Sequence, residues 1–169
     1  MDSWEYTFSN NVGNKYIVKI MKDGKRFLSS NMQDLLQSMN VGVWGIYLNR
    51  MGNFKNATSM NDLAIISRQI LSFFTTHEDA ILYYVCDDIA DVPMNARKKA
   101  EGYTVQFYRN KLFSKLFMKL QGLLNVHIVD IPICIDACGN DMFIHIIARA
   151  IHEEIAIKMK EDVIDGFSK

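Results

Sequence analysis

The first part of the chain alternates hydrophobic and polar residues with the two-residue period of strands that have one buried face. Trp4–Ser9 shows this alternation, and Tyr16–Met21 repeats it after the turn-forming cluster Asn10–Asn14. The two segments predict an N-terminal β-hairpin. Arg26–Ser29, which follows a second turn signal, is interpreted as the start of a third strand.

Later segments place apolar residues at helical spacing, which predicts helices with one buried face. These helices are expected at Asn31–Met39, Ser59–Thr76, Thr104–Gly122 and Glu153–Ile164, with a short helical turn or two at Asn95–Glu101. Asn31 is the expected N-cap of the first helix, and Ser59 with Asp62 resembles a capping box. In the third of the longer helices, Arg109 and the lysines that follow are expected to point mostly outward.

The segment Ala80–Cys86, AILYYVC, carries no charge and no strand breaker, so it predicts a strand buried on both faces. Val41–Asn49 predicts another strand, weakened by its two glycines. Val126–Ile131 and Met142–Ala150 predict a C-terminal hairpin, in which Pro132 marks an edge or a bulge. We therefore expect an α+β (α/β-like) fold. It has a single mixed, mostly antiparallel sheet with N-terminal and C-terminal hairpins, a central buried strand and about three main helices packed on it.

Composition favours one globular domain over residues 1–169. The chain is 49% hydrophobic and 22% charged with a formal net charge of zero, which argues against nucleic acid as a partner. No stretch has the length of a membrane span, and the first residues do not resemble a signal peptide. Three cysteines do not make a disulfide framework. We expect a cytoplasmic protein with reduced thiols and no membrane partner.

Charge is distributed unevenly around the central strand. Five acidic residues and no basic residue lie between Glu78 and Asp91, whereas seven basic residues and one acidic residue lie between Arg97 and Lys119. The ends of strands in open α/β sheets often carry ligand sites. The candidate ligand-binding residues are Asp87, Asp88, Asp91, Arg97, Arg109 and Asn110. These charges are also explained by surface ion pairs between the basic helix and the neighbouring loop, and this is the interpretation we favour.

Other chemistry is weaker in the sequence. Asp87, Asp88 and Asp91 offer oxygen ligands for Mg²⁺ or Ca²⁺, but no calcium-loop or phosphate-loop pattern accompanies them. Cys134 and Cys138 with two histidines lack the usual spacing of a zinc site. We therefore assign no metal site, no cofactor and no catalytic residue.

ILYYVCDD, followed by RNKLFSKLF at Arg109–Phe117, is similar to a family of small uncharacterised bacterial proteins found chiefly among the Bacteroidetes. The resemblance covers about Trp4 to Phe167, with a longer insert at Val92–Phe107 between the two motifs. It implies N-terminal strands, a strand that ends in a Cys-Asp pair, a helix with an Arg-Asn-x-Leu-Phe motif and a final hairpin. It implies no activity, but it groups Cys86 and Asp87 with Arg109 and Asn110.

Two functions remain open from the sequence. The first is a non-enzymatic module that binds a partner protein or associates with itself. The alternative is a phosphate-binding or divalent-metal-ligand-binding domain, with phosphoryl-transfer or hydrolase chemistry, whose site lies at the end of strand Ala80–Cys86.

Overall fold

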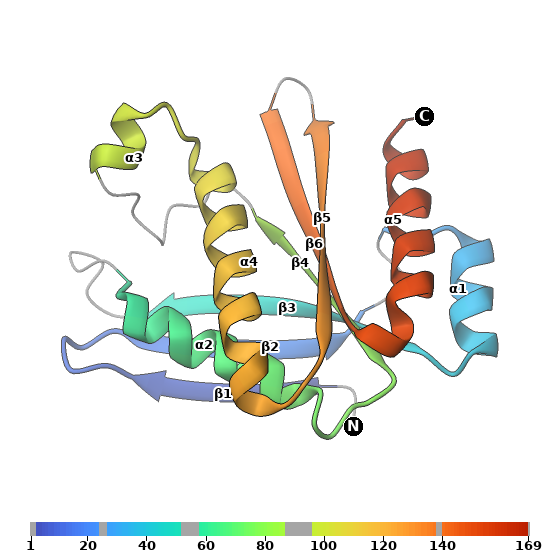
Figure 1. Ribbon diagram of the computed structural model, residues 1–169, viewed down its shortest axis with the longest axis horizontal. Coiled ribbons are helices and arrows are strands. Elements are labelled where there is room, and N and C mark those ends of the chain that lie inside the picture. Colours follow the sequence, from blue (N-terminus) through green and yellow to red (C-terminus); the bar gives the residue numbers. More distant parts are fainter. Residues whose placement is uncertain (1–2, 24–26, 52–57, 87–95, 138–139, 169) are drawn as a thin grey trace.

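The computed structural model describes residues 3–23, 27–51, 58–86, 96–137 and 140–168 (Figure 1). The strands in these ranges are β1 (Ser3–Ser9), β2 (Lys15–Lys22), β3 (Gly42–Met51), β4 (Ala80–Cys86), β5 (Ile128–Ala137) and β6 (Asn140–Arg149). The α-helices are α1 (Ser30–Ser38), α2 (Met60–Phe73), α3 (Ala96–Ala100), α4 (Val105–Leu124) and α5 (Glu153–Phe167), and a short 3₁₀ turn, η1 (Ala150–His152), precedes α5.

The strands form one mixed sheet in the order β1-β2-β3-β4-β6-β5. Strands β3 and β4 are parallel and are connected through α2, whereas the other neighbouring pairs are antiparallel. This confirms the expected fold class and both hairpins, and β4 lies inside the sheet between β3 and β6. Pro132 lies in β5, the strand at one edge of the sheet, as expected for a residue without an N–H.

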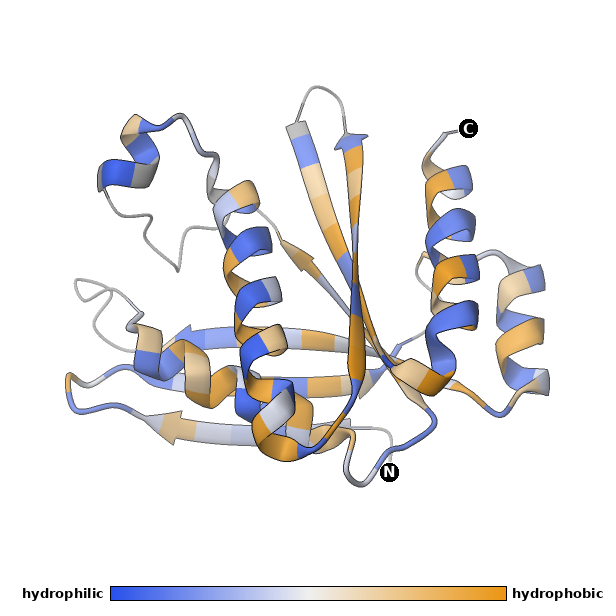
Figure 2. Ribbon diagram, in the orientation of Figure 1, coloured by the Kyte–Doolittle hydropathy of each residue, from blue (hydrophilic) through white to orange (hydrophobic). Residues whose placement is uncertain are grey.

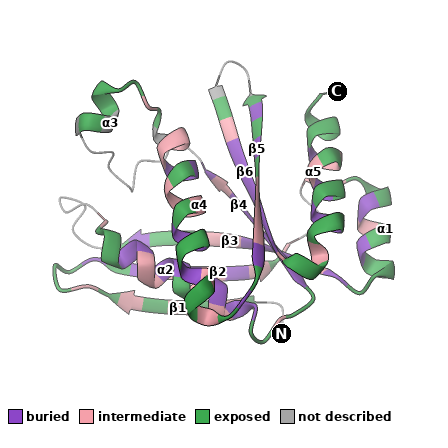
Figure 3. Ribbon diagram, viewed as in Figure 1, coloured by how far each residue is buried: buried purple, intermediate pink, exposed green. Residues whose placement is uncertain are grey.

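Helices cover both faces of the sheet and bury a separate apolar cluster on each. Helices α2 and α4 cover one face, on which Leu82 and Tyr84 of β4 are buried. Helices α1 and α5 cover the other face, on which Ile81 and Tyr83 are buried. Figures 2 and 3 show the result: the apolar, buried parts of the helices face the strands, while their polar parts face outward. Coverage on both sides explains why β4 is apolar along its whole length.

Several local details differ from the expectations. Ser29, rather than Asn31, is the N-cap of α1, and its hydroxyl accepts from the Met32 N–H. Phe27–Ser29 does not form a strand, and the preceding residues 24–26 lie outside the described ranges. The helices of the described residues agree with the expectation: α2, α4 and α5 are the three longest, and the shorter α1 and α3 form where the sequence indicated short helical segments. The capping box of Ser59 with Asp62 is confirmed.

Candidate functional site

The sheet divides between its two parallel strands. β3 pairs with β4 only over Gly42–Gly45, although β3 continues to Met51 and β4 to Cys86. Beyond this short contact β3 stays with β2 and β4 stays with β6, so the two halves of the sheet diverge. Figure 1 shows β1–β3 running across the view while β5 and β6 rise steeply from them. A wedge therefore opens at the carboxyl ends of the parallel pair.

A cavity of about 620 Å³ fills this wedge. Its size lies within the range of pockets that hold small molecules, about 300–1,000 Å³. The described walls are rich in aromatic side chains, and they come from both faces of the sheet: Tyr84 and Phe113 from the α2/α4 face, and Tyr83 and Phe167 from the α1/α5 face. The cavity thus passes around the free edge of β4 rather than lying on one side of the sheet.

Two arginines provide the charge of the described cavity wall. Arg50 lies one residue before the end of β3, and Arg109 lies in the first turns of α4. Their residues are only 9% and 8% exposed, and no acidic residue is among the described lining residues. Arg50 donates from Nη2 to Oδ1 of Asn14 at 3.2 Å, and both arginines make further contacts within the chain. Two buried guanidinium groups at one cavity favour an anion there, because arginine binds carboxylate and phosphate through paired hydrogen bonds.

The cavity wall beside Arg50 includes Tyr16, which is hydrogen-bonded to the carboxylate of Asp62. Tyr16 is paired with Arg50 across β2 and β3. Its hydroxyl oxygen lies 3.3 Å from Asp62 Oδ2, to which it donates its one proton, and 3.1 Å from Thr58 Oγ1, from which it can accept. Burial raises the pKa of Asp62, but hydrogen bonds from Asn10, from the backbone and hydroxyl of Ser59 and from Tyr16 together bring the pKa below its ordinary value. Asp62 thus stays ionised and fixes Tyr16 in the cavity wall.

Tyr47 and Tyr83 line another part of the cavity wall. Tyr83 lies opposite Gly45 in the parallel pairing, and a Cβ built on Gly45 would be only 3.0 Å from the Tyr83 hydroxyl and 3.1 Å from the Tyr47 hydroxyl. Glycine is therefore needed where the two rings meet β3. Tyr47 donates its hydroxyl hydrogen bond to Asp23 at 2.9 Å. The Tyr83 hydroxyl lies near that of Tyr47, yet within the described residues it makes no hydrogen bond of ordinary geometry.

Both neighbouring tyrosines of β4 keep their protons. Burial raises the pKa of Tyr83, and the adjacent Tyr47 and Asp23 raise it further. Burial also raises the pKa of Tyr84, with smaller contributions from Cys86 and Asp130. Both side chains are therefore neutral near pH 7.

A polar network under α4 supports the Tyr84 wall. His145 of β6 is fully buried, stacks on Tyr84 with the ring centroids 4.5 Å apart, and places Nδ1 2.7 Å from Oδ1 of Asp130. Ser114 of α4 donates to the other oxygen of the same carboxylate at 2.6 Å. Both partners bind Asp130 rather than each other, so the arrangement differs from a nucleophilic serine–histidine pair. It fixes α4 against β5 and β6.

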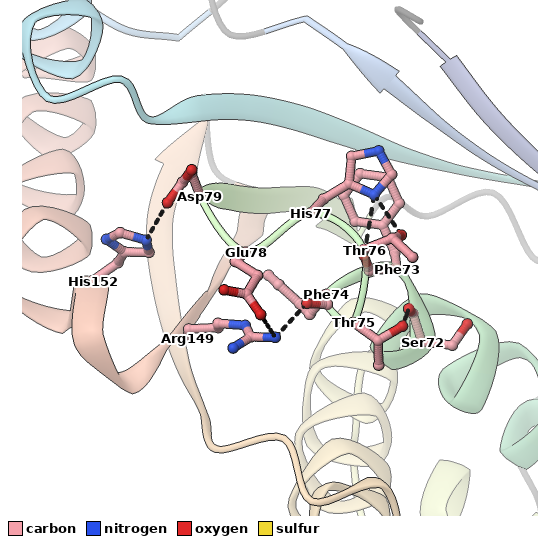
Figure 4. A network of polar contacts seen from close by, with 10 residues as sticks. All are labelled: Ser72, Phe73, Phe74, Thr75, Thr76, His77, Glu78, Asp79, Arg149 and His152. Atoms are coloured by element: carbon pink, nitrogen blue, oxygen red, sulfur yellow. Dashed lines mark hydrogen bonds and ion pairs between the residues drawn. The ribbon is translucent and has the colours of Figure 1, made fainter.

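A second network lies at the other end of β4, away from the cavity (Figure 4). Arg149 donates to the Phe74 carbonyl at 2.6 Å and lies 3.5 Å from the Glu78 carboxylate. His77 stacks on Phe73 with the ring centroids 3.9 Å apart. The Arg149 guanidinium thus provides a hydrogen bond to a backbone carbonyl that is left without a helical partner at the C-terminal end of α2. We interpret this network as a fastening between α2, β4 and β6 that serves the fold.

The residues suggested by the sequence have different positions. Asp87, Asp88 and Asp91 lie outside the described residues. Arg97 lies in α3 with its side chain 85% exposed and paired with Glu101 at 3.0 Å. Asn110 is buried in α4 but is not among the described lining residues, whereas Cys86 and Arg109 both line the cavity. The expectation that Arg109 points outward is wrong, although Lys111, Lys115 and Lys119 are exposed as expected.

Sequence reasoning did not identify Arg50, Tyr47 or Tyr83 as site residues. A usable signal was present for Arg50, since alternation along β3 places it on the same face as Trp44 and Ile46. An arginine on the inward face at the end of a strand needs a partner. The two consecutive tyrosines of a doubly buried strand gave a similar signal, because each hydroxyl needs a hydrogen bond or a cavity.

In the part of the chain that the structure describes, no three His, Cys, Asp or Glu side chains are grouped so that they could hold a metal ion. Cys134 is exposed on β5, and Cys138 lies outside that part. None of the described helices is long and apolar enough to cross a membrane.

Comparisons with known proteins add no relative. No protein-family model, no curated protein and no solved structure matches this chain. The resemblance to a Bacteroidetes family stays a prediction, and the cavity between β3 and β4 is the candidate functional site.

Proposed function

We propose that this protein binds a small molecule with an apolar body and one anionic group, a carboxylate or a phosphate, in the cavity between β3 and β4. The observation that carries the proposal is the pair of buried arginines, Arg50 and Arg109, on an otherwise uncharged and largely aromatic described wall. The site lies at the end of β4, as in the alternative function considered from the sequence, and the anionic group of the ligand binds arginine side chains. It includes no catalytic step.

The physical basis is a match between the wall and such a ligand. Aromatic and aliphatic side chains gain free energy when they remove an apolar body from water. A guanidinium in a buried site binds an anion more strongly than it does in water, because the local dielectric constant is lower and the hydrogen bonds are charge-assisted. Tyr16 and Thr58 add hydroxyl groups beside Arg50.

Isothermal titration calorimetry with cinnamate, phenyl phosphate and the neutral cinnamyl alcohol tests the proposal. We expect at least one anion to bind and the alcohol to bind about ten-fold more weakly, because charge-assisted hydrogen bonds contribute about 1.5–3 kcal/mol. Arg109→Met should weaken the anion by about ten-fold or more, with Arg109→Lys intermediate. Arg68→Met removes an exposed arginine of α2 and serves as the matched control. Absence of binding by both anions at millimolar concentration would refute the proposal.

A second candidate function, self-association, is favoured by the outer edge of β1. The strand ends the sheet, carries a half-buried row of Trp4, Tyr6 and Phe8, and contains no proline or lysine that would discourage pairing. Antiparallel pairing of two copies about Tyr6 would place Glu5 opposite Thr7 of the second copy, without a clash of like charges.

Size-exclusion chromatography with light scattering tests self-association, using substitutions at the exposed Thr7. Thr7→Glu would set two carboxylates against each other across the interface and shift the equilibrium toward monomer. Thr7→Lys would pair with Glu5 and preserve or strengthen the dimer. A wild-type protein that stays monomeric at high concentration would exclude this function.

A further inference from the structure

The outer faces of the two helical layers carry opposite charge. In α2 and α4 the exposed charged side chains are all basic, and they belong to Arg68, Lys111, Lys115 and Lys119. The one carboxylate of these two helices, that of Asp62, is buried. The zero net charge of the chain therefore conceals a basic α2/α4 face.

The α1/α5 face is mostly acidic. Helix α5 carries two lysines, and the two helices together carry six acidic residues, Asp34, Glu153, Glu154, Glu161, Asp162 and Asp165. The ion pairs between described residues involve neither the exposed carboxylates of Glu154, Glu161 and Asp165 nor the three exposed lysines of α4. Both faces thus present charges that can pair with a partner.

Exposed apolar side chains lie among these charges. On α4, Met118 and Leu123 are 58% and 68% exposed. On the other face, Ile157 and Ile164 of α5 and Ile151 of η1 are 43%, 38% and 76% exposed. Figure 3 shows that the outer sides of α4 and α5 are exposed along most of each helix. Apolar groups within a polar surround are typical of protein-binding surfaces, where their burial supplies affinity.

The spacing of these side chains allows α4 of one copy to lie along α5 of another. Residues three or four apart share one side of a helix. Such intervals relate Lys111, Lys115, Met118 and Lys119 in α4, and Glu154, Ile157, Glu161, Ile164 and Asp165 in α5. At a rise of about 1.5 Å per residue the charged rows are about 12 Å and about 16 Å long, so several lysines can meet carboxylates at once.

We infer that the α2/α4 face of one copy binds the α1/α5 face of a second copy. The lysines of α4 lie beside the carboxylates of α5, and the exposed apolar side chains of both helices are buried between them. The two faces cover opposite sides of the sheet, so they cannot meet within one copy (Figure 1). A second copy is favoured over a nucleic acid or an anionic membrane, because a partner with charge of one sign would use only the basic face.

This interface joins two different surfaces, so it does not close when two copies meet. A pair of copies keeps one free face of each kind, and further copies add unless a ring closes. Pairing through β1 would instead join identical edges and stop at two copies. The inference is independent of the anion site, because the described cavity wall includes none of these residues.

Sedimentation velocity of the full chain, at concentrations up to millimolar, measures the association. We expect the average mass to rise beyond that of a dimer in about 0.1 M NaCl and to rise less in about 1 M NaCl, because the Debye length falls from about 10 Å to about 3 Å. Thr7→Glu, which would oppose pairing through β1, should leave this rise unchanged. A protein that stays monomeric, or stops at a dimer, at the lower salt concentration would refute the inference.

Charge reversal identifies the two faces. Lys115→Glu/Lys119→Glu should weaken the association about ten-fold or more, and so should Glu154→Lys/Glu161→Lys. An equimolar mixture of these two variants should recover association to within about three-fold of wild type, because each variant supplies the unaltered face that the other lacks. Lys15→Glu/Lys22→Glu reverses two exposed lysines of β2 and is the matched control. Melting curves establish that each variant is folded.

The outcomes separate this contact from other occupants of the two faces. If the mixture does not recover association, or if reversal on α5 has no effect while reversal on α4 does, the contact between the two faces is refuted. Equal weakening by the control would show a general effect of charge and would also refute it. None of these outcomes bears on anion binding in the cavity, which calorimetry tests separately.

Discussion

Replacement of Asp130 by alanine tests whether the network beneath α4 stabilises the fold. Asp130 accepts from His145 at 2.7 Å and from Ser114 at 2.6 Å, and the His145 and Asp130 side chains are 0% and 4% exposed. In the variant the imidazole would remain buried with both ring nitrogens lacking a partner among the described residues. His145 donates its Nδ1 proton to Asp130 whether the imidazole is neutral or charged. The variant therefore loses this hydrogen bond in either charge state of His145.

The expected cost follows from this geometry. A buried donor left without its acceptor typically costs about 1–3 kcal/mol, compared with a total stability of about 5–15 kcal/mol for a domain. Ser114→Ala should cost only about 1 kcal/mol, because Asp130 keeps His145. Asp130→Asn should fall between the two, since its amide can accept from His145 while the Ser114 hydroxyl turns to accept from it.

Urea unfolding followed by circular dichroism measures these differences at constant m value. Ser114→Ala should add almost nothing when combined with Asp130→Ala, because Asp130 is the partner of that hydroxyl. A cost below about 1 kcal/mol for Asp130→Ala, or full additivity of the two substitutions, would refute the reasoning.

Three further predictions concern single side chains. The pKa of Asp62 is lower in the folded protein than its ordinary value of 3.8. The ionised carboxylate therefore contributes its full stabilisation above pH 3.8, and this stabilisation is lost as the pH falls through the folded pKa. Asp62→Asn should make the free energy of unfolding, measured with urea, less dependent on pH in the acid range. Tyr83→Phe should leave stability unchanged or raise it slightly, whereas Tyr16→Phe, which loses bonds to Thr58 and Asp62, should cost about 1 kcal/mol in thermal unfolding. Asn125 ends α4 at φ 51°, so Asn125→Ala should lower the free energy of unfolding by about 1 kcal/mol and Asn125→Gly should not.

Much of the fold was predictable because local pattern and burial agree. The predicted strand Ala80–Cys86 matches β4 at both ends, since a sheet covered on both faces requires apolar residues at every position. The capping box at Ser59 depends on four consecutive residues and was equally visible. The N-cap of α1 was misplaced by two residues, because serine and asparagine are both good caps and the sequence contains several of them there.

The candidate site was less predictable because it depends on how far two strands stay paired. The residues of β3 and β4 contain no local signal that predicts the end of their pairing at Gly45 and Tyr83. Arg109 was assigned to the outward side of its helix together with the lysines, although it is buried and lines the cavity. The pairing of Asp130 with His145 joins residues on neighbouring strands and depends on the register of the hairpin.

The short contact between β3 and β4 has a consequence for how the protein opens. Among the described residues, four pairs join β1–β3 to β4–β6 within the sheet, so this junction is expected to separate more readily than either half. Amide hydrogen exchange would then show faster exchange along Gly42–Gly45 than in the interior of the β5–β6 hairpin. A molecule held in the wedge contacts both halves and would slow that exchange, so that the protein opens as one cooperative unit when it is occupied.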